Sequence, residues 1–520
     1  MMFLADMSAR YPLLRGKKPL LLLSVIGMAL ALGAAATRLP LLAIGAEIAV
    51  LLALGILSKP DVATIAVIFI IFTNAAVVAV RYHGVPYFVG AAVPVLLVIP
   101  LASYLIFRRR GLIINPVLPL IFLFMVIQVA GTLLSSNIGT STSELTTFMV
   151  EGIGLYFLLT NVVRTPEMLR RVIWVLLAAG AFLGFLSVYQ QITQTYSNNY
   201  WGFAQMSNAA FGTGSEDIYG KVLQRRLAGP LGDQNRYAQN MLMLVPLGFF
   251  RFWGERSRLL RILAAVATGF CAMGVALTFS RGAAVAFVLV LVIMTFMRYI
   301  KPWQIGLIVL AAALLLVAVP AYRTRLATLQ GLSSLTSDDG GGAGATSADG
   351  AILSRATESL AALLVFIDHP VIGVGPGMFR YYYGDYAEYV GLRVLTTDRQ
   401  AHNLYLGVAA ETGALGEICF LLILYVTLRN LARVRKRLLE SNPELANMAT
   451  AFMLAIITYM TTGIFLHFAY LRYFWLFMAL AGATSYIANA QVPEEALSNQ
   501  AKPEDADATP DSLQMTGAHS

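Results

Sequence analysis

The sequence predicts an all-α polytopic membrane protein: a helical bundle of roughly 12–14 transmembrane helices with one large outer loop that contains amphipathic helices. The first observation is composition, because 58% of the 520 residues are hydrophobic and only 12% are charged, with a mean hydropathy of +0.70. Ordinary soluble domains carry roughly 25% charged residues. The second observation is that the apolar residues form long runs, and the third is an uneven distribution of Lys and Arg between the loops.

The apolar runs give the positions of the predicted helices. A bilayer core about 30 Å thick is crossed by around 20 apolar residues in a helix. Fourteen runs reach or approach this length, but some are short or abut one another, so twelve spans with two re-entrant or interfacial pieces are an alternative. Both cysteines fall inside such runs, which argues against a disulfide framework and against a nucleophilic thiol. The runs lie near 19–36, 40–57, 62–80, 89–107, 117–134, 145–160, 172–193, 237–253, 262–279, 282–299, 304–320, 403–428, 447–465 and 470–488.

The basic residues predict that both termini are cytoplasmic. With that orientation the inner side holds 23 of the 37 Lys and Arg residues, and the short outer loops hold only Arg38, Arg81, Arg281 and Arg472. Short cytoplasmic loops of membrane proteins carry such an excess of basic residues. Topology therefore explains most of the net charge of +9, and no nucleic-acid partner is expected. Residues 1–18 resemble a signal sequence, but the many spans that follow favour an uncleaved first helix.

The chain divides into four predicted regions. Residues 1–320 form the N-terminal transmembrane helices, with an outer segment at 194–236. Residues 321–402 form the large outer loop, and residues 403–490 form the C-terminal transmembrane helices. Residues 491–520 are polar and acidic, which predicts a disordered cytoplasmic tail.

The large outer loop has three distinct parts. Its Gly/Ser/Asp-rich tract at 335–350 is too polar to bury a core and predicts a flexible segment. Residues 351–368 carry apolar residues at helical spacing, which predicts an amphipathic helix packed on the outer ends of the bundle or lying in the membrane interface. The sequence "HPVIGVGPGMF" (369–379) is rich in turn residues. Its G-x-G is interrupted by Pro376 and follows no strand, so a dinucleotide site is not expected.

Arginines concentrate on the predicted outer side, against the usual topological preference. Arg225, Arg226 and Arg236 lie together before an apolar run, and Arg281 lies between two runs with almost no loop. The planar guanidinium suits bidentate binding of phosphate or carboxylate. The alternative is that these side chains pair with outer carboxylates, as Arg281 could with Glu411. A charge held at the membrane face often marks a functional site.

His402 is the histidine best placed for catalysis. It lies where the large outer loop enters a transmembrane helix, so it could meet both water-borne and lipid-borne substrates. No cluster of His, Cys, Asp or Glu has the spacing of metal ligands, so neither a metal nor another cofactor is predicted. A base together with convergent arginines suits a reaction in which a phosphate group leaves.

Four motifs resemble the O-antigen ligase family, which includes O-antigen polymerases and pilin-glycosylating ligases. The resemblance covers roughly residues 222–428, and the order of the motifs is more specific than any one of them. In chain order they are "RRLAGPLGDQNRYAQ", "TFSRGA", "SRATESLAALLVFIDHPVIGVGPGMF" and "HNLYLGVAAETGALGE".

The resemblance implies a metal-independent, inverting glycosyltransferase at the periplasmic face of the bacterial inner membrane. Such an enzyme moves a glycan from undecaprenyl pyrophosphate to an acceptor hydroxyl. His402 is similar to the general base of the family, and Arg226 and Arg281 are similar to its essential arginines. Arg225 and Arg236 flank the first motif and are candidates for binding the same pyrophosphate.

The expected activity is that of a lipopolysaccharide O-antigen ligase. Its partners would be undecaprenyl-pyrophosphate-linked O-antigen as donor, lipid A–core oligosaccharide as acceptor, and the lipid bilayer. An O-antigen polymerase or a protein O-oligosaccharyltransferase are alternatives within the family. A transporter of lipid-linked glycans would need polar groups along a path through the membrane, and the predicted spans are mostly free of them. A scaffold of a polysaccharide-assembly complex would have no need of His402.

Overall fold

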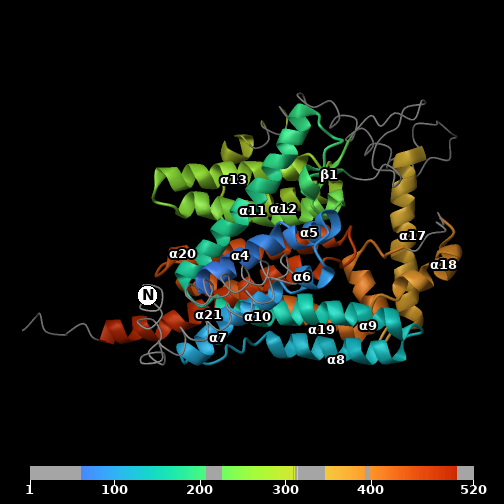
Figure 1. The fold of residues 1–520 in the computed structure, drawn as a ribbon, viewed down its shortest axis with the longest axis horizontal. Coiled ribbons are helices and arrows are strands. Elements are labelled where there is room, and N and C mark those ends of the chain that lie inside the picture. Colours follow the sequence, from blue (N-terminus) through green and yellow to red (C-terminus); the bar gives the residue numbers. More distant parts are fainter. Residues whose placement is uncertain are drawn as a thin grey trace, which may run out of the picture.

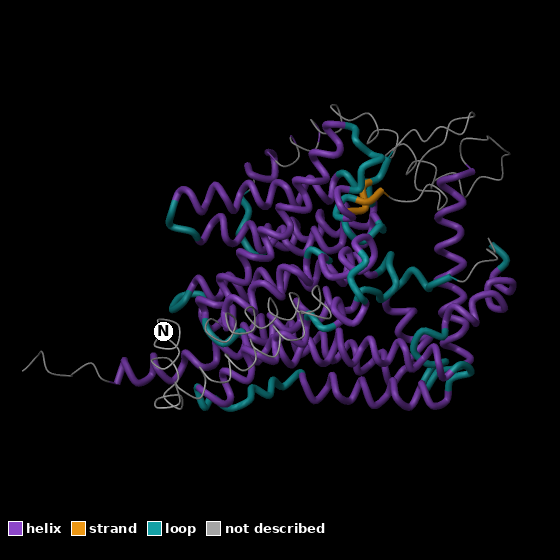
Figure 2. Tube along the Cα trace, in the orientation of Figure 1, coloured by secondary structure: helices purple, strands orange, loops and turns teal. Residues whose placement is uncertain are grey.

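The computed structural model describes residues 60–206, 225–301, 303–307, 310, 313, 346–392 and 399–500, and these ranges are almost entirely helical (Figures 1 and 2). The predicted spans near 19–36 and 40–57, most of the run near 304–320 and residues 335–345 of the tract at 335–350 lie outside the described residues. The rest of that tract, predicted to be flexible, forms the start of helix α17 (Thr346–Asp368). The helices, including short 3₁₀ and π-helical pieces labelled η, are α4 (Pro60–Phe72), α5 (Ala75–His83), α6 (Tyr87–Ala91), η2 (Pro94–Leu97), α7 (Val98–Ala102), η3 (Ser103–Phe107), α8 (Leu118–Leu134), α9 (Ile138–Thr147), η4 (Phe148–Gly154), α10 (Leu155–Val162), α11 (Pro166–Thr193), η5 (Tyr200–Gly202), α12 (Gln234–Gly254), α13 (Arg258–Ala276), α14 (Arg281–Phe296), α17 (Thr346–Asp368), α18 (Phe379–Val390), α19 (Leu404–Leu438), α20 (Pro443–Gly463) and α21 (Leu471–Gln500).

The helices confirm an all-α polytopic membrane protein. Among the described residues, six helices are long and apolar enough to cross a membrane, and α4 with α5 makes a seventh if this pair, bent by 60°, is one broken span. Each of the eleven predicted apolar runs that lie within the described residues coincides with helix. The six helices are Tyr87–Phe107, Ile138–Val162, Pro166–Thr193, Arg258–Ala276, Leu404–Leu438 and Pro443–Gly463.

A small antiparallel sheet departs from the all-α prediction. Strand β1 (Gln205–Met206) pairs with β2 (Leu227–Gly229), and both lie in the predicted outer segment. Asn74 has φ 61° at the break between α4 and α5, and its Nδ2 donates a hydrogen bond to the Pro230 carbonyl at 3.0 Å. Asn tolerates the left-handed conformation better than most residues. The broken span is therefore tied to the turn that follows β2.

Helix α12 lies in the middle of the bundle, with α11, α13 and α20 packed around it (Figure 1). Sixteen of its 21 residues are buried. Its sequence is polar in the first turn and apolar afterwards. Gln239 Nε2 donates hydrogen bonds to Thr462 Oγ1 at 2.8 Å and to the Tyr459 carbonyl at 3.2 Å, both on α20. These buried bonds fix the first turns of α12 relative to the end of α20.

One end of the bundle, here called the α17 end, carries α17 and α18. Helix α17 stands across this end, beside α18 and the first turns of α19 (Figure 1). This is the amphipathic helix predicted for the large outer loop, and it packs on the ends of the bundle helices. The turn at 369–379 connects α17 to α18 and reaches α19 by backbone hydrogen bonds, from Val374 N to the Ala410 carbonyl and from Gly375 N to the Glu411 carbonyl, both at 3.0 Å.

Glycines permit this backbone contact. Gly373 has φ +75°, and a Cβ there would lie 2.4 Å from the Glu411 carbonyl carbon. Gly413, at a kink inside α19, has φ +65°, and a Cβ there would lie 2.3 Å from the Val371 backbone. Any side chain at either position would force the two backbones apart. The glycine-rich turn is thus a docking segment that sets α17 and α18 against α19.

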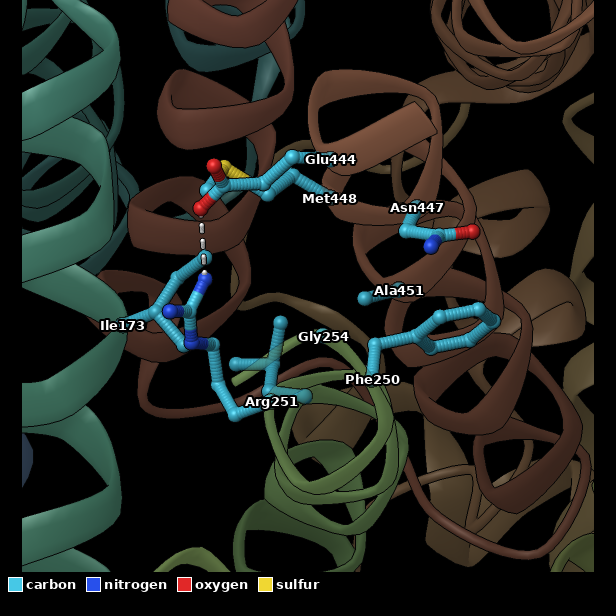
Figure 3. Close-up of a pocket in the computed structure, with 9 residues that line it drawn as sticks. Ile173, Phe250, Arg251, Gly254, Glu444, Asn447, Met448 and Ala451 are labelled. Carbon is cyan, nitrogen blue, oxygen red and sulfur yellow. Dashed lines mark hydrogen bonds and ion pairs between the residues drawn. The ribbon is translucent and has the colours of Figure 1, made fainter. Parts of the chain in front are cut away.

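The opposite end of the bundle is held by ion pairs. Glu444, at the start of α20, accepts hydrogen bonds from Arg170 Nε at 2.8 Å and Nη2 at 2.7 Å. Its Oε1 also accepts from Arg251 Nη1 at 3.1 Å, as the dashed line in Figure 3 shows. Arg251 pairs in addition with Glu255, whose Oε1 accepts from Trp174 Nε1 at 3.2 Å. Helices α11, α12 and α20 are therefore joined at this end by a network in which each arginine has a carboxylate.

Candidate active site

His402 lies at the point where the large loop enters α19. It precedes Asn403, whose side chain caps α19 by accepting hydrogen bonds from the backbone N–H groups of Tyr405 and Leu406 at 3.1 and 3.2 Å. The His402 backbone has φ 45°, in the left-handed region that few non-glycine residues adopt. Such strained positions cluster at functional sites. The helix cap and the backbone conformation together fix the direction of the imidazole.

A buried carboxyl group lies beside His402. The side chain of Glu358, on α17, is 1% exposed, and its Oε2 lies 3.8 Å from His402 Nε2. Glu358 Oε1 lies 3.8 Å from Arg399 Nη1 and accepts a hydrogen bond from Ser354 Oγ at 3.4 Å. His402 Nδ1 has no hydrogen-bond partner among the described residues. Since Nε2 faces a carboxyl group, Nδ1 is the nitrogen left to accept a proton.

The surroundings keep His402 neutral. Burial lowers the pKa of its imidazole to about 3, and three nearby positive charges act in the same direction while one carboxylate opposes them. A neutral imidazole can accept a proton, and an imidazolium cannot. The charges that lower this pKa belong to Arg355, Arg236 and Arg399, and the opposing carboxylate is Asp233.

Two further groups around His402 also have displaced pKa values. Burial raises the pKa of Glu358 to about 7, although Arg399 and Arg355 partly offset it. The ring centroid of His467 lies 5.4 Å from that of His402. Burial, followed by the charges of Arg236 and His402, holds the pKa of His467 well below its usual range. Displaced pKa values of neighbouring groups are typical of an active site.

Arg236 lies in the first turn of α12 and is 3% exposed. Both of its terminal nitrogens lack a hydrogen-bond partner among the described residues. Asp233, which caps α12, accepts hydrogen bonds from the backbone N–H groups of Asn235 and Arg236 at 2.8 and 2.9 Å. A buried guanidinium with unsatisfied donors is costly. An anionic ligand would supply the missing acceptors.

The first two sequence motifs meet in the structure. Arg226 Nε donates a hydrogen bond to the Thr278 carbonyl at 2.7 Å, and its Nη2 donates to Asn235 Oδ1 at 3.2 Å. Thr278 belongs to the motif that contains Arg281, the first residue of α14. Arg281 lies close enough for its charge to lower the pKa of Arg355 on α17. Arg226, Arg236 and Arg281 are thus gathered with His402 at the α17 end.

Arg225 and Glu411 make contacts that the sequence did not predict. Arg225 is exposed, and its guanidinium carbon lies 4.8 Å from the centroid of the Tyr196 ring, so the structure gives it a separate contact from Arg226. Glu411 was a possible partner for Arg281. Its Oε1 instead accepts a hydrogen bond from the backbone N–H of Phe379 at 3.4 Å, because the first N–H groups of α18 have no acceptor within their own helix.

Several residues around His402 were not predicted from the sequence. Arg355 and Glu358 are three residues apart on the polar side of the predicted amphipathic helix, which is the spacing of neighbours on one helix face. Arg399 lies three residues before His402, and His467 lies in the connection between α20 and α21. The i,i+3 pair on the loop helix was the available signal. We call Arg226, Arg236, Arg281, Arg355 and Arg399 the arginine cluster.

The described residues contain no group of three or more His, Cys, Asp and Glu side chains that could hold a metal ion. Glu358 and Asp233 are engaged with arginines and with a helix N-terminus, as described above. What the site offers chemically is a neutral base, a carboxyl group that ionises near neutral pH, and several guanidinium groups with an excess of positive charge.

Comparison with known proteins agrees with this site. Residues 241–421 match the model of the O-antigen ligase family, a stretch that begins in α12 and ends in α19 and contains Arg281, the α17 helix and His402. No curated protein matches the chain. Members of the family are glycosyltransferase-like ligases and polymerases that act on polysaccharides and lipid-linked partners in a membrane. The match over residues 241–421 supports membership of the O-antigen ligase family.

Proposed function

We propose that this protein ligates O-antigen polysaccharide from undecaprenyl pyrophosphate to lipid A–core oligosaccharide, at the periplasmic face of the inner membrane. The observation that carries the proposal is His402, whose Nδ1 has no hydrogen-bond partner among the described residues, together with the nearby buried Arg236, whose two terminal nitrogens also have none there. A base and an anion site in contact are what glycosyl transfer from a pyrophosphate requires.

In the proposed reaction, His402 Nδ1 takes the proton from the acceptor hydroxyl. The acceptor oxygen attacks the anomeric carbon of the donor from the side opposite the pyrophosphate, so the configuration inverts. The bond between the anomeric carbon and the pyrophosphate oxygen breaks, and its electron pair stays on the leaving group. The arginine cluster stabilises that developing charge, and Glu358 faces the imidazolium that forms on His402.

No step in this scheme uses a metal ion. Two tasks usually given to a divalent cation in pyrophosphate chemistry are binding the ground state and neutralising the leaving group. Guanidinium groups can perform both, since they stay charged and donate paired hydrogen bonds to phosphate oxygens. We therefore infer a metal-independent reaction.

Two alternatives differ in the acceptor. An O-antigen polymerase would use a second lipid-linked glycan, and a protein O-oligosaccharyltransferase would use a Ser or Thr hydroxyl. The lipopolysaccharide of a deletion strain separates them. A ligase predicts loss of long chains from lipid A with polymer accumulating on the lipid carrier, whereas a ladder limited to a single repeat indicates a polymerase, and unaltered lipopolysaccharide with loss of protein glycosylation indicates the third activity.

A purified system tests the chemistry directly. The protein in nanodiscs, with undecaprenyl-pyrophosphate-linked O-antigen and lipid A–core oligosaccharide, should form full-length lipopolysaccharide in the presence of excess chelator. Activity that chelator abolishes and magnesium or manganese restores would contradict the metal-independent mechanism. Absence of transfer with and without metal would contradict the ligase assignment.

A further inference from the structure

A cavity of 220 Å³ lies near His402 and has a different chemical character from the arginine cluster. His402 is not part of its wall, but Ala401, which precedes His402 in the chain, and His467, whose ring centroid lies 5.4 Å from that of His402, both line it. None of the residues that line the cavity is Lys or Arg. Its polar lining consists of Gln128, Glu144, Thr147, Glu151, Gln400, Glu411, Thr412, His467 and Tyr470.

The three carboxyl groups in the wall are held in place by neighbours. Arg472 Nη1 lies 2.6 Å from Glu151 Oε1, and Arg380 Nη2 lies 3.5 Å from Glu144 Oε1. Glu411 accepts from the start of α18, as described above. The oxygens are thus fixed in direction while the arginines that fix them stay outside the lining. Such a wall contains no cation to bind phosphate and presents acceptors to the hydroxyl groups of a neutral ligand.

The glycine-rich turn forms another part of the wall. Pro376 and Gly377 line the cavity, and a Cβ on Gly377 would lie 2.4 Å from Glu144 Cγ. Gly377 also has φ +72°, which disfavours any side chain there. The motif that docks α18 on α19 therefore also keeps this part of the cavity open.

Aromatic rings complete the enclosure. Phe124, Phe148, Phe379 and Phe468 line it together with Tyr470. Ligand pockets commonly combine apolar and aromatic walls with a few placed polar groups. A volume of 220 Å³ is below the roughly 300–1,000 Å³ of pockets for drug-sized ligands, which favours a ligand of about one sugar ring.

We propose that this cavity is the acceptor site and binds one neutral, unphosphorylated sugar residue, with a hydroxyl directed toward His402. The inference rests on the proposed glycosyl transfer and adds that donor and acceptor bind in separate parts of the site. Pyrophosphate is held by the arginine cluster, and the acceptor sugar is held by amide, carboxylate and aromatic groups that exclude phosphate. His402 lies between the two, which is where a base must be to take a proton from the acceptor.

The test is a pair of changes in the cavity with a matched control. Thr147→Trp places an indole in the cavity, and Gln128→Leu removes an amide of similar size. Thr146→Trp is the control: Thr146 and Thr147 are both exposed on α9, and each hydroxyl bonds the carbonyl four residues earlier, but only Thr147 lines the cavity. KM for lipid A–core oligosaccharide and Kd for the lipid-linked donor are measured for each variant in nanodiscs.

We expect KM for the acceptor to rise at least tenfold in Thr147→Trp and about three- to tenfold in Gln128→Leu, with donor Kd within twofold of the unchanged protein. Thr146→Trp should leave both constants unchanged. Unchanged acceptor KM in an active Thr147→Trp protein overturns the acceptor site but leaves the proposed function standing. A shift in donor Kd without a shift in acceptor KM assigns the cavity to the donor sugar, and this result also overturns the acceptor-site proposal. If the protein without substitutions transfers no glycan, the proposed function is refuted, and the acceptor site is refuted as well.

Discussion

Each end of helix α12 carries a buried arginine, and the two arginines differ in their partners. Arg236, in the first turn, is 3% exposed, and its terminal nitrogens have no partner among the described residues. Arg251, in the last turn, has a side chain that is 4% exposed and is paired with Glu255 and Glu444. The two residues are fifteen positions apart, or about 22 Å along the helix.

The helix dipole widens the contrast. Positive charge is favourable at the C-terminal end of a helix, where Arg251 lies, and unfavourable at the N-terminal end, where Arg236 lies. Arg251 is thus paired with two carboxylates and favourably placed on the dipole, and only its Nε lacks a partner among the described residues, whereas both terminal nitrogens of Arg236 lack one. A site that costs stability in this way is commonly one that a ligand completes. The comparison teaches that burial of an arginine alone does not identify a functional site, whereas burial without a partner does.

The largest effect should come from His402, the base at the α17 end. His402→Ala should lower the rate of transfer by roughly 10²–10⁴-fold, the usual contribution of a positioned general base. Donor binding should persist, since the arginine cluster is unchanged. Transfer rate and donor Kd, measured in nanodiscs after expression has been checked, give the result. Normal turnover by His402→Ala would refute the mechanism even though the family assignment would survive.

The comparison between the two ends can be tested with one substitution made twice. Arg236→Met should weaken donor binding by about 10- to 100-fold, because hydrogen bonds to a charged group contribute about 1.5–3 kcal/mol. It should leave the thermal midpoint unchanged or raise it, since an unpaired buried charge is removed. Arg251→Met should do the reverse. It should lower the free energy of unfolding by about 3 kcal/mol and leave donor Kd unchanged. This is the low end for a broken buried ion pair, because the Glu444 side chain is 40% exposed.

Thermal unfolding and donor binding of the two Met variants together test whether Arg236 and Arg251 have different roles. If Arg236→Met lowers the thermal midpoint as much as Arg251→Met and leaves donor binding intact, then the two arginines have the same structural role. The contrast between the ends of α12 would then be wrong.

Much of this arrangement was predictable from the sequence. The apolar runs predicted the bundle helices within the described residues, because a span must be long and apolar whatever its neighbours are. The motifs made His402, Arg226, Arg236 and Arg281 candidates for one site, which stays a prediction. It missed the break at Asn74 and the small sheet, because both depend on a contact between segments far apart in the chain.

The partners of His402 were harder to predict for the same reason. Glu411 lies only nine residues after His402 in the chain, but it accepts a hydrogen bond from the start of α18. Glu358 reaches His402 only because the glycine-rich turn docks α17 and α18 against α19. Arg355 and Arg399 come to the site by the same docking. Sequence spacing shows which residues share a helix face, but it does not show onto which other helix that face folds.

Lysine substitutions should lower the activity less, and they should do so by different amounts at two members of the arginine cluster. Arg226 is held by two fixed acceptors through Nε and Nη2, which a lysine cannot reproduce. Arg226→Lys should therefore lower kcat/KM for the donor by about 10- to 30-fold. Arg281→Lys should lower it only about three- to tenfold, because the charge at the start of α14 is kept. Equal losses, or full activity of Arg226→Lys, would contradict the idea that its fork is positioned by the two motifs.

The last effect concerns Glu358 and appears in the pH profile. Burial raises its pKa to about 7, so the carboxyl group is mostly protonated below pH 7 and becomes an anion as the pH rises through 7. The anion stabilises the imidazolium that forms on His402, so kcat should rise as the pH rises through about 7. His402 contributes no limb there, since its pKa is about 3. Glu358→Gln should lower kcat about tenfold at pH 8 and make the profile flat between about pH 5.5 and 8.5, while Glu358→Asp restores part of the limb. A limb near pH 7 that persists in Glu358→Gln would show that another group titrates and that Glu358 only packs the loop helix against His402.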